Sequence, residues 1–301
     1  MDVRPRFVLF GDSLSQRAFE PGGWGAALQD RYARKADVVN RGYSGYNTRW
    51  ASYVLPKVFP LVSSIPSPAL VTIFFGTNDA ALADQDKAKY HVPLDEYKHN
   101  ILLMIRHVQD SSLPAPALVT IFFGANDAAL PDKLSASQHV PIPEYKHRLS
   151  EFVQHLTQLS KKTRVVLIAP PPVDIPGRKR YATEAYGAGD EWEPERTNEH
   201  TGLYAAACRE VGEATGVSIV DLWTIFQQDD NWAEYLNDGL HFTEKGSAVV
   251  FKHVLAAIEK LPGQPSLAFD DLPWDYPIHS DVDHKDPKRT FEEWEARKTG
   301  V

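Results

Sequence analysis

A long segment occurs twice in tandem in this chain, and any fold must accommodate both copies. Residues 68–82 read Pro-Ala-Leu-Val-Thr-Ile-Phe-Phe-Gly-Thr-Asn-Asp-Ala-Ala-Leu, and residues 116–130 repeat them with Ala125 in place of Thr77. The match continues through His-Val-Pro and Glu-Tyr-Lys-His motifs, so we take 63–110 and 111–158 as duplicate segments. Each copy has the pattern of an apolar strand, a polar loop and a helix. Two copies are too few for a solenoid, so both must be placed in or around one sheet.

Short apolar strands alternate with helical stretches along the rest of the chain as well. Each link between strands is long enough for a crossover, which indicates a parallel sheet with helices on both faces, a three-layer α/β/α architecture. We expect one domain over residues 1–261 and an extended tail over 262–301 with a short helix near 291–297. The other expected strands are 7–10, 38–39, 164–169 and 217–223, and the other expected helices are 24–34, 49–59, 194–215 and 244–261.

Composition excludes several classes of protein. The net charge of −8 argues against a dedicated binder of nucleic acid or anionic membranes. Cys208 is the single cysteine, so no internal disulfide can form, and its apolar surroundings indicate a buried thiol. No apolar run approaches the roughly 20 residues of a membrane span, and the start of the sequence does not resemble a signal peptide. The sequence predicts a soluble, cytoplasmic protein and leaves a homo-oligomer open.

The first strand ends abruptly in Gly-Asp-Ser, at residues 11–13. Small polar residues that follow a buried strand are typical of sites at the carboxyl edge of an open α/β sheet. We therefore interpret Ser13 as a nucleophile, which requires a base, a group that orients the base, and donors for an oxyanion.

Asp238 and His241 supply a candidate base and its partner. They lie three residues apart in a polar loop before the last helix of the expected domain, so one turn brings the carboxylate to the imidazole. Such a carboxylate holds the ring in the tautomer that leaves a nitrogen free for a serine hydroxyl. The competing interpretation is a helix N-terminus with an incidental histidine, capped by Thr243 and Glu244. The interpretation of the pair as a metal site has still less support, because no cysteine or further histidine accompanies it.

Candidate oxyanion donors follow other strands. Gly45 offers a backbone N–H that a substrate can approach, and Asn78 or Asn126 offers an amide side chain. The competing interpretation of an Asn-Asp pair after a strand is an Asx-turn.

Taken in order, these four blocks resemble those of the SGNH (GDSL) hydrolase superfamily, named for Ser, Gly, Asn and His. The segments 41–50 and 220–223 and the Phe-Phe-Gly-x-Asn-Asp-Ala motifs are similar to isoamyl-acetate-hydrolysing esterases, and the Asp-Asp-Leu-Pro motif at 270–273 resembles plant-type members. No Gly-x-Ser-x-Gly motif occurs, which disfavours the nucleophile-elbow hydrolases.

The resemblance implies a flavodoxin-like parallel sheet of about five strands, plus one duplicated strand–helix segment. It implies a serine esterase in which Ser13 is acylated, His241 is the general base and then the acid, and Asp238 orients it. Short-chain esters, above all acetates, are the implied substrates, and no metal or organic cofactor is implied.

The duplication departs from the family, because members carry one Gly-x-Asn-Asp segment and only one asparagine can occupy the oxyanion position. The short link from Gly45 favours Asn78, whereas the short link to the strand at 164–169 favours Asn126; of the two we favour Asn126. We expect the surplus strand to be looped out or placed at an edge. Insertion in the middle of the sheet would push the Asp238–His241 loop away from Ser13.

Two other functions stay open. A carbohydrate deacetylase or an acyltransferase would use the same triad on other acceptors. A non-catalytic or misfolded product of the duplication would result if the extra segment blocked the site.

Overall fold

The computed structural model describes residues 4–60, 67–76, 78–79, 88–110, 116–122, 127–133, 139–261, 263 and 265–299. Within them one six-stranded parallel sheet has the order β2-β1-β3-β4-β5-β6. The α/β/α prediction is confirmed. The strands are β1 (Arg6–Gly11), β2 (Asp37–Gly42), β3 (Pro68–Phe74), β4 (Leu118–Phe122), β5 (Arg164–Ala169) and β6 (Ser218–Asp221).

Both duplicated strands lie in the middle of the sheet. β3 of the first copy pairs with β1, β4 of the second copy pairs with β5, and the two pair with each other between identical residues, from Leu70 with Leu118 to Ile73 with Ile121. The expectation that the surplus strand would be looped out or placed at an edge was therefore wrong. All five residues of β4 are buried. A strand that is apolar on both faces suits an interior position of a parallel sheet, whereas an edge would leave its hydrogen-bonding groups exposed.

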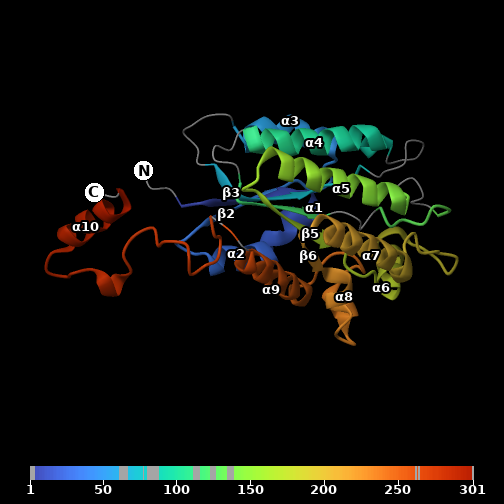
Figure 1. Cartoon of the computed structure of the whole chain (residues 1–301). Coiled ribbons are helices and arrows are strands. Elements are labelled where there is room, and N and C mark those ends of the chain that lie inside the picture. Colours follow the sequence, from blue (N-terminus) through green and yellow to red (C-terminus); the bar gives the residue numbers. More distant parts are fainter. Residues whose placement is uncertain are drawn as a thin grey trace.

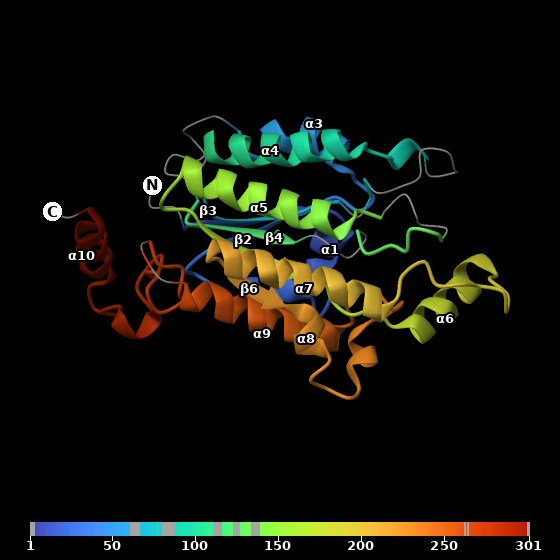
Figure 2. The same cartoon turned by 45° about the vertical axis from the view of Figure 1, so that its right-hand side comes forward.

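Helices cover both faces of the sheet (Figures 1 and 2). On one face α3, α4, α5 and α7 pack in a row, and α4 and α5 are the two duplicated helices. On the other face α2 packs against α9, and α8 also contacts α9. Each face has its own hydrophobic core, around Phe10, Val71 and Ile101 on the first and around Leu9, Leu28 and Val254 on the second. The helices of these layers are α2 (Trp24–Arg31), α3 (Thr48–Val58), α4 (Leu94–Asp110), α5 (Ile142–Leu159), α7 (Asn198–Thr215), α8 (Leu222–Phe226) and α9 (Glu244–Lys260).

Several elements differ from the sequence-based expectation, and α6 and the end of β6 are the clearest cases. Helix α6 (Ile175–Tyr186) was not predicted, because its apolar residues show no steady period. The last strand ends at Asp221 rather than at Trp223, because the Asp221 side chain accepts from Thr224 N and so begins α8.

The C-terminal tail packs on the end of α2. The Tyr32 hydroxyl donates to Leu267 O (2.8 Å), and Lys35 Nζ donates to Phe269 O (2.6 Å). Helix α10 (Pro287–Thr299) lies at the same end of the molecule as the N-terminus (Figure 1). The tail therefore stands at the amino ends of the strands, away from the edge where the candidate residues gather.

Candidate active site

The carboxyl ends of the first three strands bring Ser13, Gly45 and Asn78 to one edge of the sheet. Ser13 is the first residue of the short helix α1 (Ser13–Gln16) directly after β1, Gly45 follows β2, and Asn78 follows β3. Backbone bonds lock these ends together, because Asp12 N donates to Phe74 O (2.9 Å) and Tyr43 N donates to Gly11 O (2.7 Å).

The local geometry of this edge leaves donors available. Gly45 has φ +80°, a conformation that a glycine adopts without a steric penalty, and a Cβ added there would meet nothing within 4 Å. Asn78 Nδ2 donates to Tyr46 O (2.9 Å), which ties the first Gly-x-Asn-Asp segment to the loop of Gly45. Within the described part of the chain, the backbone N–H groups of Ser13 and Gly45 donate to no acceptor. No described acceptor therefore competes with a ligand oxygen for these two N–H groups.

Asp238 and His241 are paired in the loop before α9. His241 Nδ1 lies 2.8 Å from Asp238 Oδ2, and the backbone N–H of His241 donates to Asp238 Oδ1 (2.8 Å). Burial alone would raise the pKa of the Asp238 carboxyl, but its hydrogen bonds with His241 outweigh burial and hold that pKa well below its usual range. The loop is closed by a bond from Asn237 N to His241 O (2.7 Å). The carboxylate therefore stays ionised and fixes the imidazole ring.

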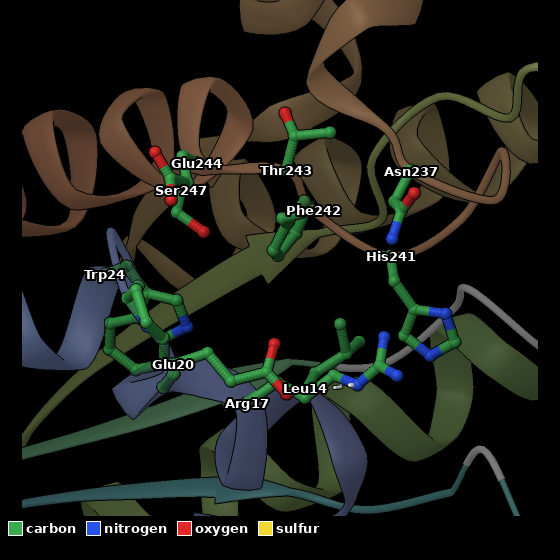
Figure 3. A pocket seen from close by; sticks show the side chains of 13 residues that line it. Leu14, Arg17, Glu20, Trp24, Asn237, His241, Phe242, Thr243, Glu244 and Ser247 are labelled. Atoms are coloured by element: carbon green, nitrogen blue, oxygen red, sulfur yellow. Dashed lines mark ion pairs between the residues drawn. The ribbon is translucent and has the colours of Figure 1, made fainter.

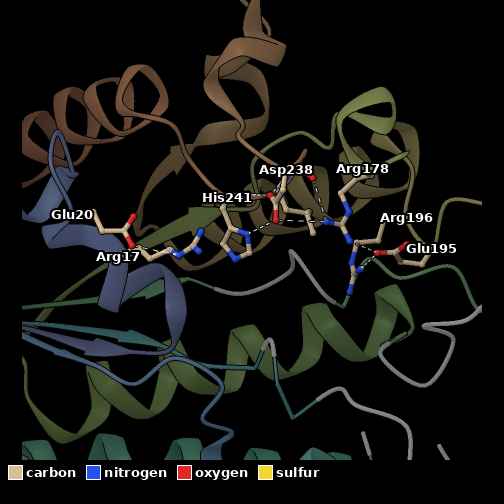
Figure 4. A network of polar contacts seen from close by, with 8 residues as sticks. Arg17, Glu20, Arg178, Glu195, Arg196, Asp238 and His241 are labelled. Carbon is tan, nitrogen blue, oxygen red and sulfur yellow. Dashed lines mark hydrogen bonds and ion pairs between the residues drawn. The ribbon is translucent and has the colours of Figure 1, made fainter. Parts of the chain in front are cut away.

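Arg178 and Glu195 support this loop, and the sequence analysis missed both (Figure 4). Arg178 Nη1 donates to Asp238 O (3.2 Å) and lies 3.7 Å from Asp238 Oδ2, while Arg178 Nη2 donates to Glu195 Oε1 (2.8 Å). Gly239, at φ +80°, lies against the start of α6, and its carbonyl accepts from Asp174 N (3.1 Å). No spacing in the sequence links α6 to residues 60 positions later, so only the fold reveals this support.

A pocket of about 440 Å³ opens beside His241 (Figure 3). Its walls come from α1 and the turn after it, the start of α2, and the start of α9. The lining side chains include Leu14, Arg17, Trp24, His241, Phe242 and Ser247.

The two halves of the candidate site are not bonded to each other. Among the described residues neither the Ser13 hydroxyl nor His241 Nε2 has a hydrogen-bond partner. Catalytic hydrogen bonds of ligand-free enzymes are often long and tighten only when substrate binds. Asn126 lies outside the described residues, as do Gly124 and Ala125 beside it.

A search of the described residues finds no group of three or more metal-binding side chains, and no described helix is long and apolar enough to cross a membrane.

Comparison with known proteins places this chain in a family. Two models of the GDSL-like lipase/acylhydrolase family match the chain, one over residues 7–116 and the other over residues 100–249. A GDSL esterase/lipase of Arabidopsis thaliana is 41% identical over 97% of this chain and 99% of its own length. The isoamyl acetate-hydrolyzing esterase 1 homolog of Homo sapiens is 35% identical over 85% of this chain and 82% of its own length.

A lipase/acylhydrolase from Enterococcus faecalis is similar in structure, with a TM-score of 0.48 and 20% identity over 84% of this chain and 95% of that one. The sequence relatives define the class of protein, an ester hydrolase on an α/β/α sheet. The chain belongs to the GDSL-like lipase/acylhydrolase family and is a carboxylic ester hydrolase.

Proposed function

We propose that this hydrolase cleaves short-chain, acetyl-type esters with Ser13 as nucleophile, His241 as general base and acid, and Asp238 as the group that orients His241. The observation that carries the proposal is the 2.8 Å contact between His241 Nδ1 and Asp238 Oδ2, which leaves His241 Nε2 as the nitrogen available for proton transfer. This pair lies at the same carboxyl edge of the sheet as Ser13, the arrangement that an acyl-transfer site requires.

The reaction follows from these roles. Ser13 Oγ attacks the ester carbonyl carbon while its proton passes to His241 Nε2, and the carbonyl oxygen becomes an oxyanion. The imidazolium then gives that proton to the alcohol oxygen, the bond to the alcohol breaks, and an acyl-enzyme remains. Water attacks the acyl-enzyme with its proton passing to His241, which returns a proton to Ser13 Oγ as the carboxylic acid leaves.

We propose the backbone N–H groups of Ser13 and Gly45 and the side chain of Asn78 as the oxyanion donors. Strand order supports Asn78 over Asn126, because β3 lies beside β1 whereas β4 lies one strand further away, about 4.8 Å across the sheet. This choice differs from the one we favoured on sequence alone, which rested on the link from the second copy to the following strand.

Labelling with a fluorophosphonate, followed by peptide mapping, tests the nucleophile. We expect the label on Ser13, and Ser13→Ala should lose hydrolysis of p-nitrophenyl acetate and labelling together while its thermal melting is unchanged. Ser44→Ala is the matched control, because Ser44 is exposed in the neighbouring loop, and it should keep both. Full activity in Ser13→Ala would refute the proposal.

The two asparagines are separated by paired substitutions. Asn78→Ala should lower kcat by about 100-fold or more, the usual cost of losing one oxyanion donor, whereas Asn126→Ala should leave kcat within a few-fold. The opposite result would assign the oxyanion position to the second copy.

A further inference from the structure

We propose that Glu195 is a positioning residue for ester hydrolysis. It holds Arg178 and offsets the charge of that guanidinium, and so sets the pH range in which His241 can act as a base. The inference rests on the roles proposed for Asp238 and His241, and it adds a group that belongs neither to the triad nor to the oxyanion donors.

His241 and Arg178 share one oxygen of Asp238. His241 Nδ1 lies 2.8 Å from Asp238 Oδ2, and Arg178 Nη1 lies 3.7 Å from the same atom. The side chains of Asp238 and Arg178 are only 11% and 15% exposed, so water screens their charges weakly. In the proposed reaction His241 becomes an imidazolium that Asp238 must stabilise. A guanidinium beside the same carboxylate opposes the formation of this second cation.

Glu195 lies on the other side of Arg178 and compensates its charge. Glu195 Oε1 accepts a hydrogen bond from Arg178 Nη2 (2.8 Å) and another from Arg196 Nη1 (3.1 Å), so one carboxylate oxygen holds two guanidiniums. The guanidinium carbon of Arg178 also lies 5.3 Å from the centre of the Tyr181 ring. Figure 4 shows the resulting row of side chains, along which the sign of the charge alternates from Asp238 to Arg196.

Glu195 and Arg196 both carry their charges at neutral pH. Burial alone would raise the pKa of Glu195, but the charges of Arg196 and Arg178 outweigh burial and lower that pKa. Burial lowers the pKa of Arg196 to about 10, and the charges of Glu195 and Asp127 limit the fall. Loss of the Glu195 charge would therefore leave Arg178 uncompensated on the side away from Asp238.

Other charged groups surround this loop and stay unchanged in the variants below. The titratable side chains that face it from the neighbouring elements are Arg17, Glu20, Asp174, Arg180, Tyr181 and Glu244. Arg17 and Glu20 form a pair of their own, with Nε 3.7 Å from Oε1. A change in the pH profile of these variants therefore reports on the row that contains Glu195.

Glu195→Gln tests the proposal, because glutamine keeps an oxygen for the hydrogen bond from Arg178 and removes the charge. Phenyl acetate is a suitable substrate, since its product phenol stays un-ionised across the acid range. We expect the acid limb of the kcat/KM profile to move to lower pH by about 0.5–1 unit, less than the 1–3 units that a charge in direct contact causes. Because the imidazolium forms only in the transition state, kcat should fall while KM changes by about twofold or less.

Glu193→Gln is the matched control. Glu193 lies two residues earlier in the same segment, its side chain is 67% exposed, and it pairs with Lys133 Nζ (2.7 Å) instead of with the row. This variant should keep the pH profile of the wild type.

Arg178→Gln should move the acid limb in the opposite direction, to higher pH, because it removes the cation that opposes the imidazolium. Asp238 keeps its bonds from Leu240 N (3.0 Å) and His241 N (2.8 Å) in this variant. If Arg178 did no more than hold the loop, its loss would loosen Asp238 from His241 and move the limb to lower pH. The direction of the shift therefore separates an electrostatic role from a structural one, and it does so without Glu195→Gln.

The double variant Glu195→Gln/Arg178→Gln removes one charge of each sign and should bring the acid limb back close to that of the wild type. A shift of Arg178→Gln to lower pH, shifts of both single variants in the same direction, or no shift in either would overturn the proposal. A failure of the proposed function gives a different result, because His241→Ala would then keep its hydrolytic activity.

Discussion

We expect the Asp79 carboxyl group to make the stability of this protein depend on pH. Asp79 is 3% exposed, and its Oδ1 accepts hydrogen bonds from the backbone N–H of Thr48 (2.8 Å) and from the Thr48 hydroxyl. Its Oδ2 is buried and has no hydrogen-bond partner among the described residues. Burial disfavours the charged form more than the bonds with Thr48 favour it, and so raises the pKa of Asp79 to about 7.

The sign of the effect follows from proton binding. Between the unfolded pKa of about 3.9 and the folded pKa of about 7, the folded state binds the proton and the unfolded state does not. The free energy of unfolding therefore falls as pH rises through this window, and it levels off above pH 7. A difference of about 3 units, at about 1.36 kcal/mol per unit, gives a loss on the order of 4 kcal/mol.

Asp79→Asn removes this titration while its Oδ1 still accepts both bonds from Thr48. The new amide leaves an unpaired buried donor, which costs about 1–2 kcal/mol at every pH. We therefore expect the variant to be less stable than the wild type near pH 4 and more stable above pH 7, by about 2 kcal/mol. Urea unfolding followed by circular dichroism across this range measures both curves. Parallel wild-type and Asp79→Asn curves would refute the reasoning.

Other substitutions test the loop that carries Asp238 and His241. Arg178→Gln should lower the free energy of unfolding by about 2 kcal/mol, the value of a hydrogen bond to a charged group. It should also reduce kcat more than it changes KM. The control is Arg180→Gln, because Arg180 lies on the exposed side of α6. Gly239→Ala should cost about 1–3 kcal/mol in urea unfolding, because φ is +80° and the new Cβ would lie 2.4 Å from a backbone oxygen. His241→Ala removes the bonds that depress the pKa of Asp238. The stability that ionised Asp238 contributes is lost as pH falls through its folded pKa, so acid unfolding should begin at a higher pH than in wild type.

The sequence predicts where the helices and strands lie along the chain better than it predicts which elements pack beside one another. The strand at Phe7–Phe10, the end of α7 at Thr215 and the Thr243 cap of α9 all depend on contacts within a few residues, and local patterns identify them. The place of the second copy was mispredicted, because strand order is decided by pairing across the sheet and both copies offer the same apolar strand. Arg178 was missed for a related reason, since its partners come from two other parts of the chain.

The two duplicated segments show which contacts depend on the local sequence and which depend on the neighbouring elements. In both copies the same backbone bond closes the loop, from Val92 N to Asp79 O (2.9 Å) and from Val140 N to Asp127 O (3.2 Å). Contacts of the helices that follow are different, because each helix meets different neighbours. Glu96 on α4 pairs with Arg49 on α3, whereas its counterpart on α5, Glu144, pairs with Arg148 on its own helix.

The two copies also take different positions relative to Ser13, although their strands are nearly identical. Of the two duplicated strands, β3 is the one that borders β1, and among the described residues the loop of the first copy bonds to the residue beside Gly45, through Asn78 and Tyr46. The loop of the second copy contacts a different segment, because Leu130 N donates to Glu195 O. The side chain of Glu195 in turn accepts a hydrogen bond from Arg178. One copy therefore faces the proposed oxyanion position and the other backs the loop of Asp238. Nearly identical sequences therefore contact different partners, because the sheet gives each copy a different neighbour.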